Sequence, residues 1–351
     1  MQTIYIRTLK RVEHTVFCVQ DGQKYYYDSQ FNRRIPFSSG QQIKRSILDK
    51  LASEINREPA PTTFLFDVND KNELKEGEVF ATCDPTYPDQ LFGGWMKAAK
   101  GGNERTIKRR SPLSISAMRG LHPLLAGISN ENISFDRSDR PNNLVIVRNA
   151  KGEELNEEEI EVLLAGKDRS LSRKWIPDNR RAGGLFVQDI AIDLRRLFCV
   201  ALNPIEPEVT VETEKRLRET GWIESANVFG KCLVAPAEVR RELIPALAES
   251  LIEWSITSNQ SRTFSLMETL AVTISNNANK IAASIRAKLS EEDENKVYPI
   301  VEENLEGISS FVSLTAGGYI RTKTESFDAL ENAKQKLIEM MNEFNYENQL
   351  E

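Results

Sequence analysis

Basic residues placed at a predicted helix start are the pattern in this sequence most suited to a chemical role. Arg33 and Arg34 precede the start, and Lys44 and Arg45 lie on the first turn of the helix. The N-terminus of a helix presents unpaired N–H groups and partial positive charge, which favour an oxyanion. Guanidinium groups beside it can add bidentate contacts to a phosphate. The segment therefore predicts a phosphate-binding site, although a solvated loop followed by a helix cap explains it equally well.

A second basic segment, GGWMKAAKGGNERTIKRRSPLSISAMRG (residues 93–120), combines Lys and Arg with an aromatic residue and a methionine. Nucleic-acid contacts use charge for the phosphates and apolar or aromatic side chains to stack on or separate bases. Two Gly-Gly pairs would let this loop fold over a strand, and a mobile basic loop without a ligand is the alternative. The candidate nucleic-acid contacts in this segment are Trp95, Met96, Lys97, Lys108, Arg109 and Arg110.

Two further segments carry weaker signals. Asn259, Gln260 and Arg262 stand just before an expected strand, and a capped turn explains them as well as a binding site does. In TAGGYIRTK two glycines precede Arg321, and glycines allow close backbone approach to a phosphate. A simple turn is an equal explanation of that segment.

Catalytic and metal-binding patterns are missing from the sequence. His14 and His122 are the two histidines, and neither stands in a motif that would make it the base of a nucleophile. The four cysteines, Cys18, Cys83, Cys199 and Cys232, contain no close pair of the kind that holds zinc. No glycine-rich nucleotide-binding motif occurs. We therefore expect a binding protein without enzymatic activity, metal or cofactor.

The charge distribution is more informative than the net charge of −6 over 351 residues. Residues 93–122 contain seven Lys or Arg and one acid, whereas residues 290–351 contain fourteen acids and five bases. The local field governs where a phosphate chain binds, so the net charge does not exclude a nucleic acid. The sequence has neither an apolar run long enough to span a bilayer nor a secretory signal at its start, so we expect a cytoplasmic protein without membrane contact.

The expected elements interleave strands and helices without a regular βαβ count, which indicates an α+β fold with insertions. Ser38 and Ser39 are candidate N-caps of a helix in which Ile43, Ile47, Leu51 and Ile55 form one apolar stripe. Further helices are expected at 153–166, 236–258, 278–290 and about 326–344. Strands are expected at 3–20, 24–28, 62–68, 111–118, 142–149 and 270–274, with a strand or hairpin at 183–202.

Three segments, taken in order, carry a family resemblance. NRRIPFSSGQQIKRSILD, then QLFGGWM with KRRSPLSISAMRGLHPLL, then SNQSRTF cover about one seventh of the chain, spread from residue 32 to 264. Together they resemble the DevR-like family of CRISPR-associated proteins, the repeated backbone subunit of type I Cascade complexes. The resemblance implies a modified RRM-like (ferredoxin-like) palm with helical finger insertions and a β-hairpin thumb. It implies one such domain over 1–351, with a thumb or loop insertion at about 57–140, a helical insertion at about 150–182 and an acidic helical segment at about 290–351.

The same resemblance implies that copies stack along a guide RNA (crRNA) and present it for pairing with target DNA, in contact with other Cascade subunits. Each thumb would kink the guide at regular intervals. Carried over by motif, Arg33, Arg34, Ser39, Gln41, Lys44 and Arg45 would grip the guide backbone. The loop from Gly93 to Arg110 would be the thumb or an adjacent clamp, with Met96 or Trp95 as the wedge. Asn259, Gln260 and Arg262 would be a secondary contact. The sequence FGGWM departs from the expected single glycine followed by an aromatic residue, which leaves the wedge residue open.

Two alternatives remain. Related type III backbone subunits cut target RNA with a loop aspartate, for which Asp28 is the candidate here, although a turn acid explains that residue more simply. The chain could instead be an RNA-binding regulator that works alone, outside an assembly.

Overall fold

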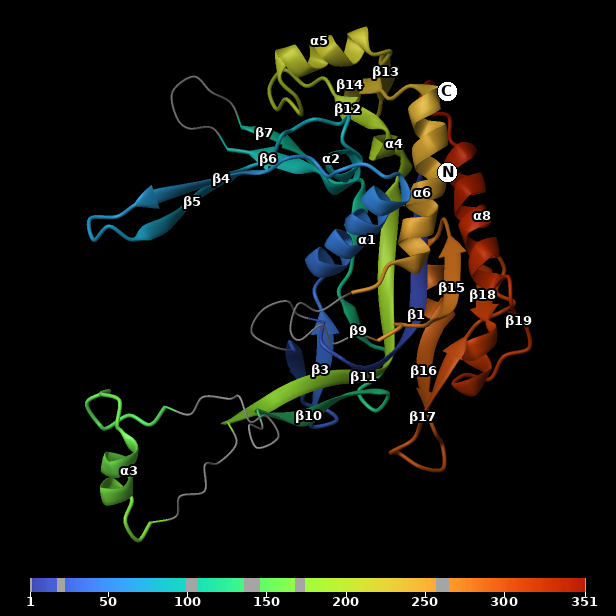
Figure 1. Ribbon diagram of the computed structural model, residues 1–351. Helices are drawn as coiled ribbons and strands as arrows, with labels where there is room; N and C mark the ends of the chain where they lie inside the picture. The colour runs from blue at the N-terminus through green and yellow to red at the C-terminus, as the bar shows by residue number, and fades with distance from the viewer. Residues whose placement is uncertain are drawn as a thin grey trace. The chain divides into compact units, whose positions relative to one another are not determined.

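The computed structural model describes residues 2–17, 23–98, 106–135, 146–167, 174–256 and 265–350. The chain divides into two compact units (Figure 1). The larger unit comprises Met1–Ile128 and Ala182–Glu351, and the smaller one comprises Ser129–Arg181. Cys18 and the expected turn at Asp21-Gly22 lie outside the described residues.

A ten-stranded sheet forms the centre of the larger unit, with the order β19-β18-β15-β1-β11-β9-β3-β2 and with β8 and β10 also paired to β11. The strands are β1 Thr3–Thr15, β2 Tyr25–Asp28, β3 Arg33–Ser38, β8 Leu113–Ile115, β9 Met118–Gly120, β10 Ala126–Phe135, β11 Lys174–Asp193, β15 Thr269–Ser275, β18 Ser309–Ser313 and β19 Glu325–Ser326. The β18–β19 pair is parallel, and β1 is antiparallel to both its neighbours, β11 and β15. The sheet and its helices confirm the expected α+β class.

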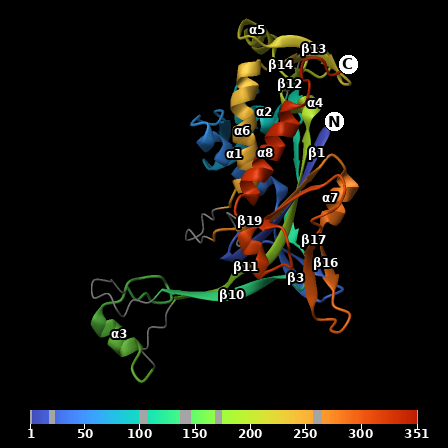
Figure 2. The same cartoon turned by 90° about the vertical axis from the view of Figure 1, so that its right-hand side faces the viewer.

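One face of the sheet is covered by α1 (Gly40–Glu54), α6 (Ala237–Glu253) and α8 (Ala329–Asn342). Figure 2 shows α6 and α8 lying next to each other over this face. The predicted stripe of α1 is confirmed, because Ile43, Ile47 and Leu51 are fully buried in the core. The Oγ of Ser39 accepts a hydrogen bond from Gln42 N at 3.3 Å, so Ser39 is the N-cap.

The opposite face is covered over part of its area. Helix α7 (Ala278–Ser284), the hairpin of β16 (Ile285–Leu289) and β17 (Val297–Val301), and the 3₁₀ turn η1 (Leu314–Gly318) contribute to this side. A second cluster of buried residues forms here, and Leu9 of β1 belongs to it. The helix expected at 278–290 is wrong after Ser284, because Ile285–Leu289 alternates apolar and polar residues and pairs with β17 as a strand.

Three smaller groups of elements complete the larger unit. The hairpin of β4 (Thr63–Val68) and β5 (Leu74–Phe80) contains the expected strand at 62–68. Helix α2 (Pro88–Gly93) is followed by the hairpin of β6 (Trp95–Lys97) and β7 (Ile107–Arg109). The segment expected as a strand or hairpin at 183–202 becomes the end of β11, then α4 (Leu194–Leu197) and β12 (Cys199–Ala201). Strand β12 joins a three-stranded sheet with β14 (Gly230–Val234) and β13 (Ile223–Asn227), next to α5 (Val211–Glu219).

The smaller unit contains α3 (Glu157–Leu163), a helix with three acids in its first turn, as predicted. Asn156 and Glu159 form a capping box at its start. The strand expected at 142–149 is wrong in its described part, where Arg148 forms an isolated bridge to Glu154. The reason is a turn centred on Asn149, whose side-chain oxygen accepts the N–H groups of Lys151 and Glu153.

Within the described part of the chain, no helix combines the length and the apolar character needed to cross a membrane. Cys83, Cys199 and Cys232 are buried free thiols. The limits of the insertions expected at 57–140, 150–182 and 290–351 stay a prediction.

Gly40 is the point at which α1 meets the sheet, and it generates the first test. A Cβ at this position would lie 2.4 Å from the backbone oxygen of Ile115, in β8. We expect Gly40→Ala to lower the free energy of unfolding by about 1–3 kcal/mol, since backbone must move to relieve the contact. Gly317→Ala is the matched control, because no atom lies within 4 Å of its added Cβ. Urea titration should leave that control unchanged or stabilised by less than about 1 kcal/mol. Equal effects of the two changes would contradict this account of Gly40.

Candidate nucleic-acid interface

The structure brings the first two predicted segments together. The start of α1 packs on β8 through Gly40, and the Nζ of Lys44 donates to the backbone oxygen of Gly93 at 3.2 Å. Gly93 itself would place a Cβ 3.1 Å from Leu48 of α1. The glycines in SSGQQ and FGGWM therefore allow close packing between the segments.

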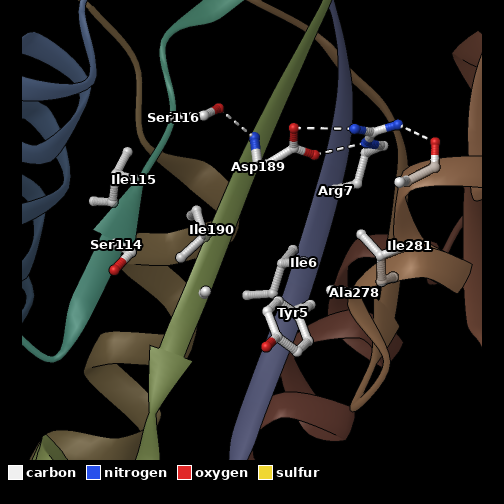
Figure 3. Close-up of a pocket in the computed structure, with 12 residues that line it drawn as sticks. Tyr5, Ile6, Arg7, Ser114, Ile115, Ser116, Asp189, Ile190, Ala278 and Ile281 are labelled. Atoms are coloured by element: carbon white, nitrogen blue, oxygen red, sulfur yellow. Dashed lines mark hydrogen bonds and ion pairs between the residues drawn. The ribbon is translucent and has the colours of Figure 1, made fainter.

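Asp189 of β11 joins the central strands through its carboxylate. Arg7 of β1 donates from Nε to Oδ1 at 2.6 Å and from Nη2 to Oδ2 at 3.0 Å (Figure 3). Arg119 of β9 donates to Oδ2 from both terminal nitrogens, at 3.2 and 3.3 Å. The backbone N–H of Asp189 donates to the Oγ of Ser116 at 2.8 Å. One carboxylate thus holds two guanidinium groups, which leaves a surplus positive charge on this part of the sheet.

Aromatic side chains continue this surface towards β2. Arg119 is opposite Phe37 in the β3–β9 pairing, and the Phe37 ring lies 6.3 Å from that of Tyr26. Tyr26 is 39% exposed and the Arg119 side chain 42% exposed, so both are accessible to a ligand. Burial and then Asp28 raise the pKa of Tyr26, while Arg119 opposes this shift, so both charged groups lie near the Tyr26 hydroxyl. We name the group of Tyr26, Phe37, Arg119, Asp189 and Arg7 the sheet row.

Strand β3 carries two further exposed arginines, at the end of the strand away from Arg119. Arg33 and Arg34 are exposed, and within the described part of the chain neither forms an ion pair. The guanidinium of Arg34 lies 5.2 Å from the centre of the Tyr25 ring. This stretch, expected as a loop, is instead a strand: Arg33 and Arg34 pair with β2, and the end of the strand pairs with β9. As consecutive strand residues, the two arginines point to opposite faces of the sheet.

The predicted contacts on α1 differ in their exposure to solvent. Gln41 is exposed, and the Arg45 side chain is 79% exposed, with Asp49 at 3.6 Å. Ser39 is engaged as the N-cap. Lys44 is partly buried, and its pKa is lowered by burial and then by the nearby Arg109 guanidinium. Lys44 therefore links α1 to α2, whereas Gln41 and Arg45 face solvent.

The β6–β7 segment divides into buried and exposed residues. Trp95 is buried and its Nε1 donates to the backbone oxygen of Glu208 at 2.7 Å. Arg109 is buried, donates to the backbone oxygens of Leu91, Arg196 and Cys199, and has its pKa lowered to about 10 by burial. Both residues hold the hairpin against its neighbours. Of the two residues expected as the wedge, Trp95 is therefore buried, and Met96 is accessible with 63% of its surface exposed.

The other bases of this hairpin are accessible. Lys97 and Arg110 are exposed, and neither forms an ion pair with a described residue. Lys108 is exposed and pairs with Glu206 at 2.9 Å. Gly94 has a φ of +76°, and a Cβ there would lie 2.6 Å from the backbone oxygen of Arg109, so the second glycine of FGGWM is needed to turn the chain into the hairpin.

The remaining predicted contacts are elsewhere. Asn259, Gln260 and Arg262 lie outside the described residues. Arg321 is exposed, with its guanidinium 5.7 Å from the centre of the Tyr298 ring of β17. It shares a hollow with Glu302 and Glu303, so its surroundings are acidic.

The side chains of Asp28 and His122 both accept hydrogen bonds from backbone N–H groups in turns. The Oδ1 of Asp28 accepts the N–H of Phe31 at 2.9 Å, as a turn acid does. The Nδ1 of His122 accepts the N–H of Leu124 at 3.1 Å, and its ring packs edge-on against Phe31. Burial lowers the pKa of His122, and Asp28 opposes this shift. The described residues contain no group of three or more side chains placed to hold a metal ion.

Comparisons with known proteins give low similarity. No family model matches the chain, and no curated protein matches it. One solved structure, titled a CRISPR RNA-guided surveillance complex in a pre-nicking state, aligns over 96% of this chain and 89% of its own, with 8% identity and a TM-score of 0.47. Another, titled a CRISPR RNA-guided surveillance complex, aligns over 96% of this chain and 84% of its own, with 12% identity and a TM-score of 0.39. At these values neither alignment carries an assignment.

The exposed arginines of β3 generate the second test. We expect the double variant Arg33→Ala/Arg34→Ala to weaken binding of single-stranded RNA of any sequence. The slope of log affinity against log salt should become shallower by about 1.4, from two lost phosphate contacts. Lys215→Ala/Arg241→Ala is the control, since it removes the same charge from exposed positions on α5 and α6. Equal losses in the two variants, measured by fluorescence anisotropy, would show that net charge and not the β3 surface controls binding.

Proposed function

We propose that this protein binds a guide RNA as a repeated backbone subunit of a type I CRISPR surveillance complex. It acts by binding and not by catalysis, and it presents the guide for pairing with target DNA. The observation that carries the proposal is the surface of β3, β9 and β11. Strand β3 carries the exposed Arg33 and Arg34, which form no ion pair with a described residue, and it pairs with β2, which carries Tyr26, and with β9, which carries the exposed Arg119.

The chemistry of this surface suits a single strand of RNA. Its cations are spread over adjacent strands, so they can follow a phosphate chain, and its aromatic rings can stack on unpaired bases. The group includes no reactive nucleophile and no metal-binding cluster among the described residues. Contacts of this kind do not read sequence, which fits a subunit whose specificity comes from the base pairing of its guide.

The order of the three sequence motifs supports the family named in this proposal. The first two segments of the resemblance to DevR-like proteins overlap β3, α1, α2, β6–β7 and β8–β9, and the third lies outside the described residues. In this proposal the main sheet is the RRM-like palm. The two hairpins inside the expected insertion at 57–140 are the candidates for the thumb.

These hairpins have opposite charge. Residues 95–110, around β6–β7, contain six bases and one acid, whereas residues 63–80, in β4–β5, contain five acids and two bases. The β4–β5 hairpin also exposes large apolar side chains, among them Phe64, Phe66 and Leu74. We therefore assign β6–β7, with Met96, to the RNA, and β4–β5 to a protein neighbour in the assembly.

The test is to purify the protein from a host that resembles its native one and to sequence the nucleic acid that copurifies. We expect short RNAs of uniform length that share one end derived from a CRISPR repeat. Added RNA of increasing length should bind a proportionally increasing number of copies, measured by mass photometry. A fixed one-to-one complex at every length would favour the stand-alone regulator. Protein free of RNA that binds no added guide at low salt would contradict the proposal.

A further inference from the structure

A hollow lies on the sheet face beside α7, next to the sheet row. It encloses about 430 Å³ and is bordered by β1, β8 and β11 on the sheet and by α7 at its side (Figure 3). Its lining is largely apolar and includes Tyr5, Ile115, Ala191, Ala278, Ile281 and Ala282. The space exists because small residues stand where larger ones would fill it: Ala191 on β11, and Ala278 and Ala282 on α7.

The edges of the hollow carry one ion pair and two hydroxyl groups. At one end Arg7 and Asp189 satisfy each other, so neither brings an uncompensated charge into the apolar space. The hydroxyls of Tyr5 and Ser114 have no hydrogen-bond partner among the described residues, and the Ser114 side chain is exposed. An occupant would therefore meet an apolar lining, one aromatic ring and two hydroxyls that can each donate or accept.

We propose that this hollow takes one unpaired base of the bound RNA, with the phosphates of that nucleotide on Arg119. The inference rests on the proposed function and adds a base-binding position to it. A heteroaromatic ring can stack on Tyr5 and hydrogen-bond to the hydroxyls of Tyr5 and Ser114. A phosphate would lose its hydration against apolar residues, and an aliphatic side chain would leave the hydroxyls unpaired.

The size and the position of the hollow support the same occupant. Its volume lies in the lower part of the range for small-molecule sites, which provides room for one ring system. Asp189 lines the hollow and also binds Arg119, so a strand that crosses the sheet row passes the open side of the hollow. The charge next to the hollow is positive, as the phosphates of such a strand require.

The experiment uses the full chain and RNAs that carry the fluorescent base 2-aminopurine at one position each, moved stepwise along the strand. Stacking quenches this base, so the positions that enter the hollow appear as quenched positions. Ala191→Leu fills the hollow, and Tyr5→Leu keeps apolar bulk but removes the ring. Ala150→Leu is the control for the first change, because Ala150 is exposed and belongs to the smaller unit.

We expect quenching at one position or at regularly spaced positions with the unmodified protein and with Ala150→Leu. It should be lost at those positions with Ala191→Leu and Tyr5→Leu, while total RNA affinity falls by roughly tenfold, the scale of one lost stacking contact. Free 2-aminopurine riboside at the same concentration should not be quenched, since the phosphate contacts hold the base in place.

Three outcomes overturn the inference. An unchanged quenching pattern in both hollow variants would place the stacked bases elsewhere and leave the proposed function intact. Equal quenching of the free riboside would make the hollow a nucleoside site independent of RNA. If the unmodified protein binds no RNA, the proposed function itself fails, and this inference fails with it.

Discussion

The shared carboxylate of Asp189 is the interaction on which the candidate surface depends. Arg7 and Arg119 come from strands on either side of β11, and their guanidinium groups would repel each other without an anion between them. The Arg7 side chain is only 11% exposed, and such a group is costly to bury without a partner. With Asp189 in place, Arg7 is satisfied and Arg119 keeps part of its surface open. Asp189 therefore stabilises the sheet by allowing two arginines to lie close together. Because it compensates only one of their charges, the surface keeps a net positive charge.

Local sequence patterns predicted the elements that depend on local physics. The stripe of α1 and its Ser39 cap follow from spacing and cap chemistry, as does the acidic start of α3. Local sequence patterns gave the wrong element where pairing with a neighbouring strand decides the conformation. The alternation of Ile285–Leu289 is compatible with a strand, and pairing with β17 decides that the helix ends before it; Arg33–Ser38 is a strand because it lies between β2 and β9. No property of either segment alone specifies these partners.

The candidate site was predictable only in part for the same reason. Arg33 and Arg34 stand out in the sequence and are exposed on β3. Arg7 and Asp189 are 182 residues apart, so no motif joins them, and the pairing of β1 with β11 alone brings them together. Trp95 and Arg109 have the residue types of an RNA contact, yet the backbone around Glu208 and Cys199 engages them inside the fold. Exposure, which separates a contact from a structural residue, is a property of the tertiary structure.

In the proposed function, RNA lies across β2, β3, β9 and β11 beside the start of α1. Photocrosslinking of RNA that contains 4-thiouridine, followed by mass spectrometry of the crosslinked peptides, tests it most directly. We expect crosslinks within residues 25–45 and 113–122, with a further group at 95–98 around Met96. Crosslinks absent from these segments and gathered at 206–231 or 286–303 would contradict it.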